Sequence, residues 1–229
     1  MARDEPEPSR GYGQYCPITR AVEVLGERWS LLILRDMLIG ATRFNDIARG
    51  NPGLSRSLLS KRLRQLERAQ IVEHVEDRWL LTDAGRDLED LVFGLGRWGA
   101  RWQFEEPRED ELDPGVLMWW VHDRLDYTAL ADRRMVIEFR FSDHRDRFWL
   151  LRDAQGPSVC KFDPGFGVDA TVRSDVRTMY QVWLGKRNLR EALRAGELEI
   201  DGTPAVARRL PKALQLSPIA AVVAAEARS

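Results

Sequence analysis

The stretch that decides the fold runs from Gly53 to Gln70 and reads GLSRSLLSKRLRQLERAQ. Ser55 near its start is a favourable N-cap residue for a helix. Leucines then recur at i, i+4 and i+7, at positions Leu59, Leu63 and Leu66. This spacing is typical of one face of an amphipathic helix, so we expect that face to be buried.

The opposite face of this predicted helix is cationic and rich in hydroxyl groups. Its members are Arg56, Ser57, Ser60, Lys61 and Arg64. Arginine and lysine can contact phosphates and guanine edges, and serine can bond to either, so this face suits a DNA major groove. A solvated basic surface is the alternative, because charged residues usually lie outside.

A short helix and a tight turn are predicted immediately before Ser55. Phe44, Ile47 and Ala48 can form the inner face of a helix that ends at Gly50, and Asn-Pro-Gly then favours a turn. In a helix-turn-helix motif the first helix crosses the DNA backbone and the second enters the groove. Arg43 and Arg49 are therefore candidate phosphate contacts, with ordinary surface arginines as the alternative.

The flanking sequence adds further helices and a hairpin. Helices are predicted over Pro17–Leu25 and from Ser30 to Gly40, and residues 71–82 read as two strands around a turn at Glu76 to Arg78. A hairpin in this place is a wing. From Asp83 a long amphipathic helix carries an apolar stripe of Leu88, Leu91, Val92, Leu95, Trp98 and Trp102. We interpret it as a dimerisation helix, with packing on the second half of the chain as the alternative.

Composition and charge divide the 229 residues into two domains. Residues 20–68 carry ten Lys and Arg against five Asp and Glu, whereas the whole chain has a net charge of −1, so the remainder carries −6. Basic charge is thus concentrated around the predicted groove-binding helix. The predicted organisation is a flexible arm at 1–14, a DNA-binding and dimerisation domain at 15–104, a charged, proline-bounded linker at 105–114 and a second domain at 115–229.

The second domain is predicted to be α+β. Alternating strands are expected within 134–173, helices begin near Ser174 and Asn188, and ELEIDG forms a last strand. Large rings are abundant there and could line an apolar cavity, although a solid core is equally compatible with the pattern. The candidate ligand-pocket residues are Trp119, Trp120, Phe139, Trp149, Phe162, Tyr180 and Trp183.

Four short motifs carry a family resemblance: Cys16-Pro17, Gly26-Glu27-Arg28-Trp29, Arg43-Phe44-Asn45-Asp46-Ile47, and Ser60-Lys61-Arg62-Leu63 with Leu66-Glu67. Over residues 14–104 the chain resembles the HxlR-type, MarR-like winged helix-turn-helix regulators of bacteria. The resemblance implies a homodimer formed through terminal helices, bound to a near-palindromic operator in double-stranded DNA. The family's wing normally has a longer, basic or proline-containing tip. Here Arg78 is the one cationic candidate in the wing, beside acidic residues that would repel phosphate.

Residues 115–225 are similar, more weakly, to the sterol-carrier-protein-like fold, in which a small twisted sheet and helices enclose an apolar tunnel. The similarity lies in the strand-rich segment 134–173, in SDVRTMYQVWLG followed by LREALRAGELEIDG, and in the apolar tail. It implies an apolar ligand-binding or interaction module, and hence a one-component regulator.

Cys16 precedes the first predicted helix, and a helix N-terminus can lower the pKa of a thiol. Several HxlR-type proteins use a cysteine there to sense oxidants or electrophiles, so Cys16 is a candidate redox sensor. A partly buried structural cysteine beside Trp29 is the alternative.

Other chemistries have no sequence support. The histidines at 74, 122 and 144 are scattered, so we expect no metal site, and the absence of nucleotide-binding or nucleophile motifs predicts no cofactor and no enzyme. The two cysteines cannot form a disulfide framework, which is consistent with a reducing compartment. The sequence contains no apolar run typical of a signal peptide or a membrane span. We therefore expect a cytoplasmic protein.

The sequence thus predicts a homodimeric, sequence-specific DNA-binding transcriptional regulator, modulated by an apolar small-molecule effector in the second domain. The predicted DNA contacts are Arg43, Ser55, Arg56, Ser57, Ser60, Lys61, Arg64 and Arg78. The rival hypothesis is a carrier of lipid or another apolar small molecule whose winged helix serves dimerisation or protein docking.

Overall fold

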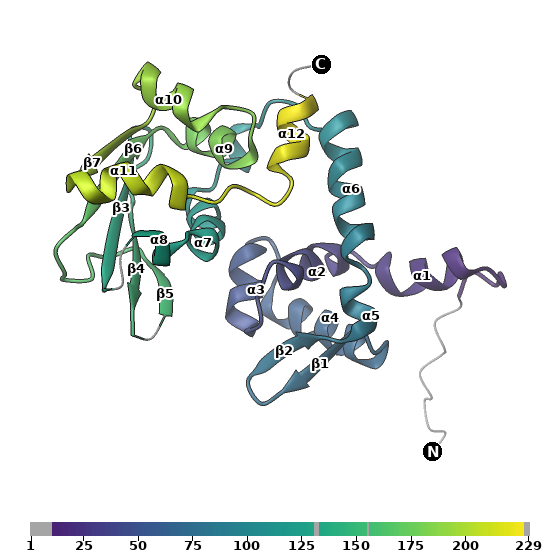
Figure 1. Ribbon diagram of the computed structural model, residues 1–229. Coiled ribbons are helices and arrows are strands. Elements are labelled where there is room, and N and C mark those ends of the chain that lie inside the picture. Colours follow the sequence, from purple (N-terminus) through teal and green to yellow (C-terminus); the bar gives the residue numbers. More distant parts are fainter. Residues whose placement is uncertain (1–10, 131–132, 155, 227–229) are drawn as a thin grey trace. The chain divides into compact units, whose positions relative to one another are not determined.

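The computed structural model describes residues 11–130, 133–154 and 156–226 (Figure 1). Most of the arm predicted at 1–14 lies outside the described residues. The chain divides into two compact units, Met1–Val92 and Phe93–Ser229, and each is described by itself.

The first unit is built around the two-faced helix that the leucine spacing predicts. Its helices are α1 (Pro17–Leu25), α2 (Ser30–Leu38), α3 (Phe44–Gly50) and α4 (Arg56–Arg68). Ser55 caps α4, because its hydroxyl accepts a hydrogen bond of 3.3 Å from the Leu58 N–H. Leu59 and Leu63 are fully buried with Ile33, Leu34 and Ile47, so α2, α3 and α4 share one core.

A short wing follows α4. Strands β1 (Val72–Val75) and β2 (Arg78–Leu81) pair antiparallel with Val75 opposite Arg78. Glu76 and Asp77 therefore form the whole turn, and Glu76 has a left-handed φ of 55°. The compact acidic turn predicted from the sequence is confirmed.

The long helix predicted from Asp83 is interrupted, and this part of the prediction is wrong. The structure has α5 (Asp83–Arg86), a turn at residues 87 and 88, and then α6 (Glu89–Trp102). The Thr82 hydroxyl caps α5 at the Gly85 N–H and also contacts the carbonyls of Gln70 and Ile71. A Cβ on Gly85 would lie 2.2 Å from the Ile71 carbonyl oxygen. These tertiary contacts hold α5 at the base of the wing, and a turn separates it from α6.

The second unit is the α+β sheet domain that the sequence predicts. Its strands are β3 (Met135–Phe141), β4 (Arg147–Asp153), β5 (Gly156–Cys160), β6 (Ala170–Ser174) and β7 (Glu199–Gly202). They form one sheet in the order β5-β4-β3-β6-β7, in which the β3–β6 pair alone is parallel. The helices are α7 (Pro114–Arg124), α8 (Tyr127–Leu130), α9 (Val176–Leu184), α10 (Leu189–Ala195), α11 (Pro204–Ala213) and α12 (Ala220–Glu226), with a 3₁₀ turn at Glu109–Glu111.

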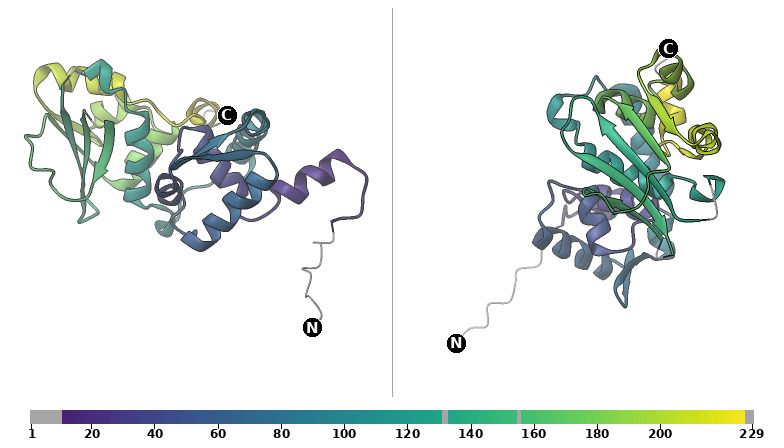
Figure 2. Two further views of the ribbon diagram at one scale, coloured as in Figure 1. Left: turned by 90° about the horizontal axis from the view of Figure 1, so that it is seen from below. Right: turned by 90° about the vertical axis from the view of Figure 1, so that its left-hand side faces the viewer.

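The main core of this unit lies between one face of the sheet and the helices. Ile137 and Phe139 of β3 and Phe148 of β4 are buried there with residues of α7, α9 and α11. The alternating residues of the same strands lie on the other face, where Val136, Trp149 and Leu151 form a small separate cluster. The strands face the viewer in the right-hand view of Figure 2.

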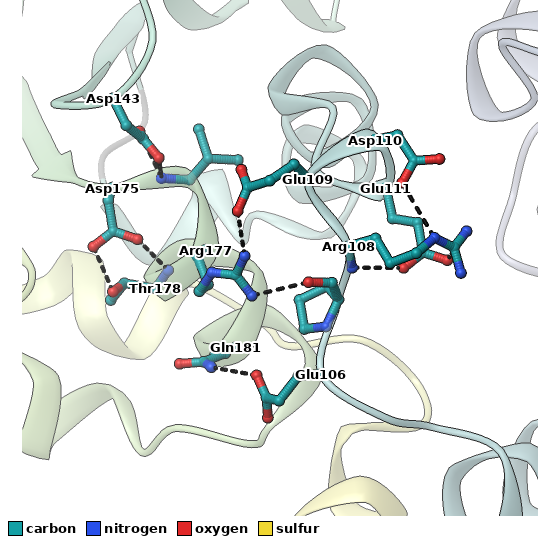
Figure 3. Close-up of polar contacts among 12 residues, drawn as sticks. Glu106, Arg108, Glu109, Asp110, Glu111, Asp143, Asp175, Arg177, Thr178 and Gln181 are labelled. Carbon is teal, nitrogen blue, oxygen red and sulfur yellow. Dashed lines mark hydrogen bonds and ion pairs between the residues drawn. The ribbon is translucent and has the colours of Figure 1, made fainter.

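Residues 105–113 contact α9 and the residue Lys186 just after it (Figure 3). The Arg177 guanidinium donates to the Pro107 carbonyl at 3.0 Å and to the Glu109 carboxylate at 2.5 Å. The Tyr180 hydroxyl donates to the Asp113 carbonyl at 2.9 Å, and Lys186 pairs with Glu106 at 3.2 Å. The boundary between the two compact units lies at Val92/Phe93. This position is N-terminal to the linker predicted at 105–114.

Within residues 11–130, 133–154 and 156–226, no helix combines the length and the apolar character needed to span a membrane.

Candidate DNA-binding face

The outer face of α4 carries the predicted groove-facing residues. Arg56, Ser57, Lys61 and Arg64 are exposed, and Ser60 is half-buried. Ser55 is exposed at the N-cap, where its hydroxyl lies 3.3 Å from that of Ser57. The structure therefore gathers six of the eight predicted DNA contacts on one helix and its cap.

Arg62 belongs to the same helix but points inward. It is 8% exposed, and its Nε donates to the Arg28 carbonyl at 3.0 Å. Its Nη2 pairs with a Glu27 carboxylate oxygen at 2.5 Å, and its Nη1 donates to Gln65 at 2.6 Å. Arg62 therefore ties α4 to the segment that joins α1 and α2, and it contributes no free charge to the outer face.

A buried polar cluster fixes the turn that precedes α4. The Asn51 amide nitrogen donates to the Asp36 carboxylate at 2.6 Å and to the Ile47 carbonyl at 2.9 Å. Arg35 donates to the other Asp36 oxygen at 2.8 Å. Burial raises the pKa of Asp36, and contact with Arg35 partly opposes that rise. The cluster was not predicted, although one acidic residue inside the apolar run LLILRDML was the available signal.

Space around this cluster is limited at Gly50. A Cβ at that position would lie 2.2 Å from an Asp36 carboxylate oxygen. The last position of α3 therefore has no room for a side chain beside the buried Asp36 carboxylate, and a glycine occupies it.

Arg43 and Arg78 lie together beside the turn of the wing. The two residues form an isolated antiparallel bridge, and the Trp79 N–H donates to the Thr42 carbonyl at 2.7 Å. The Arg43 Nε lies 3.7 Å from an Asp77 carboxylate oxygen, with both side chains mostly exposed. The structure thus places these two candidate phosphate contacts side by side, next to an acidic turn that reduces the local positive charge. Arg49 is exposed on α3.

Cys16 occupies the N-cap position of α1. Hydrogen bonds from the backbone N–H groups of Thr19 and Ile18, together with the Thr19 hydroxyl, lower the pKa of the thiol. The direction agrees with the effect expected at a helix N-terminus. A role for Cys16 as a redox sensor stays a prediction.

The seven predicted pocket residues do not line one cavity, so this prediction is corrected. Phe139, Tyr180 and Trp183 are packed in the main core, whereas Trp149 lies on the opposite face of the sheet. Phe162 is 86% exposed. Trp119 and Trp120 are half-buried on α7. Alternation along the strands separates these rings, because Phe139 pairs with Phe148 while Trp149 pairs with Glu138.

Hollows in the surface are lined by other residues. One of about 480 Å³ in the second unit is bordered by Phe104, Gln181, Lys186 and Val223. Another of about 340 Å³ is bordered by Asp113, His144 and Lys161. In the part of the chain that the structure describes, no three His, Cys, Asp or Glu side chains are grouped to hold a metal ion.

Known proteins match mainly the N-terminal part of the chain. Residues 24–107 match the family described as "HxlR-like helix-turn-helix". The "Uncharacterized HTH-type transcriptional regulator Rv3095" of Mycobacterium tuberculosis is 42% identical over 89 residues, which are 36% of this chain and 56% of that protein. The chain thus spans about half the length of this relative. The "Uncharacterized HTH-type transcriptional regulator sll1512" of Synechocystis is 30% identical over 122 residues, which are 50% of this chain and 90% of that protein.

Two solved structures extend the comparison. The quinone-bound YodB from B. subtilis is 32% identical, with a TM-score of 0.35, and the match covers 38% of this chain and 99% of YodB. The ubiquinone synthesis protein UbiJ-SCP2 is 15% identical, with a TM-score of 0.32, and the match covers 55% of this chain and 98% of that one. The match to the family over residues 24–107, with relatives of which the chain covers nine-tenths, establishes that this chain belongs to the HxlR-like helix-turn-helix family.

Proposed function

We propose that this chain is a sequence-specific transcriptional regulator that binds double-stranded DNA through α4. The observation that carries the proposal is the two-faced character of this helix. Its leucines are buried in the core, while Arg56, Lys61 and Arg64 are exposed on the other side. In a helix-turn-helix protein the second helix enters the major groove, where these side chains can contact bases and phosphates.

We also propose that two copies associate through α6. Leu91 and Leu95 are each 47% exposed, and Trp98 and Trp102 are 56% and 61% exposed. These residues recur at i, i+4, i+7 and i+11 and form an apolar stripe along the helix. A two-fold dimer would cover the stripe on both copies and would match a near-palindromic operator.

Part of α6 is already covered within the second unit. A Cβ on Gly96 would lie 3.2 Å from the Ile219 side chain, which immediately precedes α12. The Gly96 side of α6 therefore packs on the second half of the same chain, as the alternative to dimerisation expected. We propose that the exposed apolar stripe of α6 binds a second copy of the chain.

The second unit is the proposed site of an apolar small-molecule effector. We propose the hollow of about 480 Å³ as its binding site, because Ala100 near the C-terminal end of α6 and Phe104 just after it contribute to the lining. A ligand bound there would contact the helix proposed to form the dimer. A cytoplasmic location stays a prediction from the sequence.

The experiment that tests the main proposal is a fluorescence-anisotropy titration of the full chain against a duplex from its own upstream region. It is run at two salt concentrations with a scrambled duplex as competitor. We expect tight, salt-sensitive binding that the competitor does not displace. Binding no tighter than to the scrambled duplex would contradict the proposal. Mass spectrometry for a co-purified apolar ligand would then test the carrier hypothesis.

A further inference from the structure

The side chain of Arg56 is held by two consecutive residues of α3. Its Nη2 donates a hydrogen bond of 2.9 Å to the Asn45 side-chain oxygen. Its guanidinium carbon lies 4.9 Å from the centre of the Phe44 ring, within the range of a cation–π contact. The guanidinium at the start of α4 is therefore directed onto the preceding helix.

The other exposed cations of the face differ from Arg56. Across the residues that the structure describes, Lys61 and Arg64 have no comparable ion pair, side-chain hydrogen bond or ring contact. Their side chains can sample many rotamers, whereas Arg56 has one arrangement stabilised by neighbours. This difference suggests that the three cations have different roles on DNA.

The contacts of Arg56 leave most of its hydrogen-bonding capacity available. A guanidinium has five N–H donors in one plane, and Asn45 accepts from one of them. The Phe44 ring contacts the flat side of the group and uses none. The remaining N–H groups can therefore make the paired hydrogen bonds with which arginine binds phosphate.

We propose that Asn45 and Phe44 are positioning residues that hold Arg56 ready to bind a DNA phosphate, and that Arg56 does not read a base. The first helix of the motif crosses the DNA backbone, so a guanidinium held against α3 lies on the phosphate side of the interface. Fixing a long side chain before binding reduces the conformational entropy that is lost in the complex. This inference rests on the proposed DNA-binding function of α4.

A purely structural role is the competing explanation, in which the Asn45–Arg56 hydrogen bond only ties α3 to α4. The two roles make different predictions. A structural tie would be broken by either substitution, so Asn45→Ala and Arg56→Ala should both lower the thermal unfolding temperature, and any loss of DNA affinity should follow that loss of stability. A positioning role should weaken the DNA affinity of Asn45→Ala while its thermal unfolding stays like that of the wild type.

The test is a double-mutant cycle in the full chain with Asn45→Ala, Arg56→Ala and the double variant. Affinity is measured for the upstream duplex and for a scrambled duplex at several salt concentrations. We expect Arg56→Ala to weaken binding to both duplexes roughly tenfold. It should also reduce the slope of log K against log salt by about 1. Asn45→Ala should weaken both about threefold when Arg56 is present and have no further effect when it is absent.

Arg68→Ala is the matched control, because Arg68 is an exposed arginine in the last turn of the same helix. We expect this variant to bind both duplexes like the wild type. Thermal unfolding of every variant checks that the fold is retained.

Three outcomes would overturn the inference, and they can be told apart. If the wild type fails to prefer its upstream duplex, the proposed function itself is wrong. If the wild type binds but Arg56→Ala weakens the upstream duplex alone, Arg56 reads a base. If Asn45→Ala has its full effect in the Arg56→Ala background, Asn45 does not act through Arg56.

Discussion

The side-chain amide of Asn51 donates a hydrogen bond to the buried carboxylate of Asp36 across the turn of the helix-turn-helix, with 2.6 Å between the two atoms. Because Asn51 precedes α4 and Asp36 belongs to α2, this bond fixes the point at which the DNA-facing helix begins. Removing it should leave a buried carboxylate with one partner fewer. We expect Asn51→Ala to lower the free energy of unfolding by about 2 kcal/mol. Urea denaturation measures the change, and an unaltered midpoint would contradict the assigned role.

The same carboxylate predicts a pH dependence of stability. Burial raises the pKa of Asp36 in the folded state above its unfolded value of about 3.9. The folded state therefore binds the proton more tightly, and stability decreases as the pH rises from the unfolded pKa through the raised folded pKa. Asp36→Asn removes this titration. The stability of the wild type relative to Asp36→Asn should fall over that interval, and parallel pH profiles for the two proteins would exclude the effect.

The stripe on α6 predicts the oligomeric state. Trp98→Glu places a charge in the middle of the apolar surface proposed to bind a second copy, so the variant should be monomeric at concentrations where the wild type is dimeric. Light scattering after size-exclusion chromatography measures the mass. Phe162→Glu is the control, since this exposed ring lies outside the stripe. Equal masses for the wild type and Trp98→Glu would refute dimerisation through α6.

Alanine substitutions of Lys61 and Arg64 should have different effects on DNA binding. Lys61→Ala should weaken binding to upstream and scrambled duplexes alike and reduce the salt slope by about 1, as expected for a phosphate contact. Arg64→Ala should reduce the preference for the upstream duplex by about 1–3 kcal/mol, as expected when an arginine reads a base. Competition binding measures both quantities. Unchanged affinity after both substitutions would rule out α4 as the DNA-binding helix.

Cys16 should react as a partly ionised thiol. The N–H groups of Thr19 and Ile18 lower its pKa, so its alkylation rate should reach half-maximum at a pH below the value of about 8.5 for a free cysteine. A Cys160→Ser background leaves Cys16 as the single thiol. Iodoacetamide labelling followed by mass spectrometry gives the pH profile. Half-maximal reactivity at the ordinary cysteine value would contradict the effect of the helix N-terminus.

Local sequence was sufficient where a pattern and its structural cause lie in the same segment. The leucines of α4 recur at helical spacing, and Ser55 caps the helix through its own hydroxyl. The wing was predicted for the same reason, because two strands of alternating residues flank a two-residue turn. The prediction of the α+β unit also depended on local alternation.

Prediction failed where contacts distant in sequence decide the structure. The α5 segment is held through the Ile71 carbonyl, which accepts a hydrogen bond from the Thr82 hydroxyl and which a Cβ on Gly85 would approach within 2.2 Å. Residues 105–113 read as a linker because their partners, Arg177 on α9 and Lys186 just after it, are about 70–80 residues away. The ring residues were grouped by composition, whereas strand register places Phe139 and Trp149 on opposite faces.

Because Arg62 is already paired, α4 has fewer cations available to bind DNA than its formal charge indicates. A cation that binds a phosphate displaces condensed counterions, and their release into solution drives much of the association. The Arg62 guanidinium is already neutralised by Glu27 and hydrogen-bonded to the Arg28 carbonyl. It would therefore displace none. The ion release attributable to the outer face of α4 is set by its proposed phosphate contacts, Arg56 and Lys61, and a count of basic residues in the sequence overestimates it.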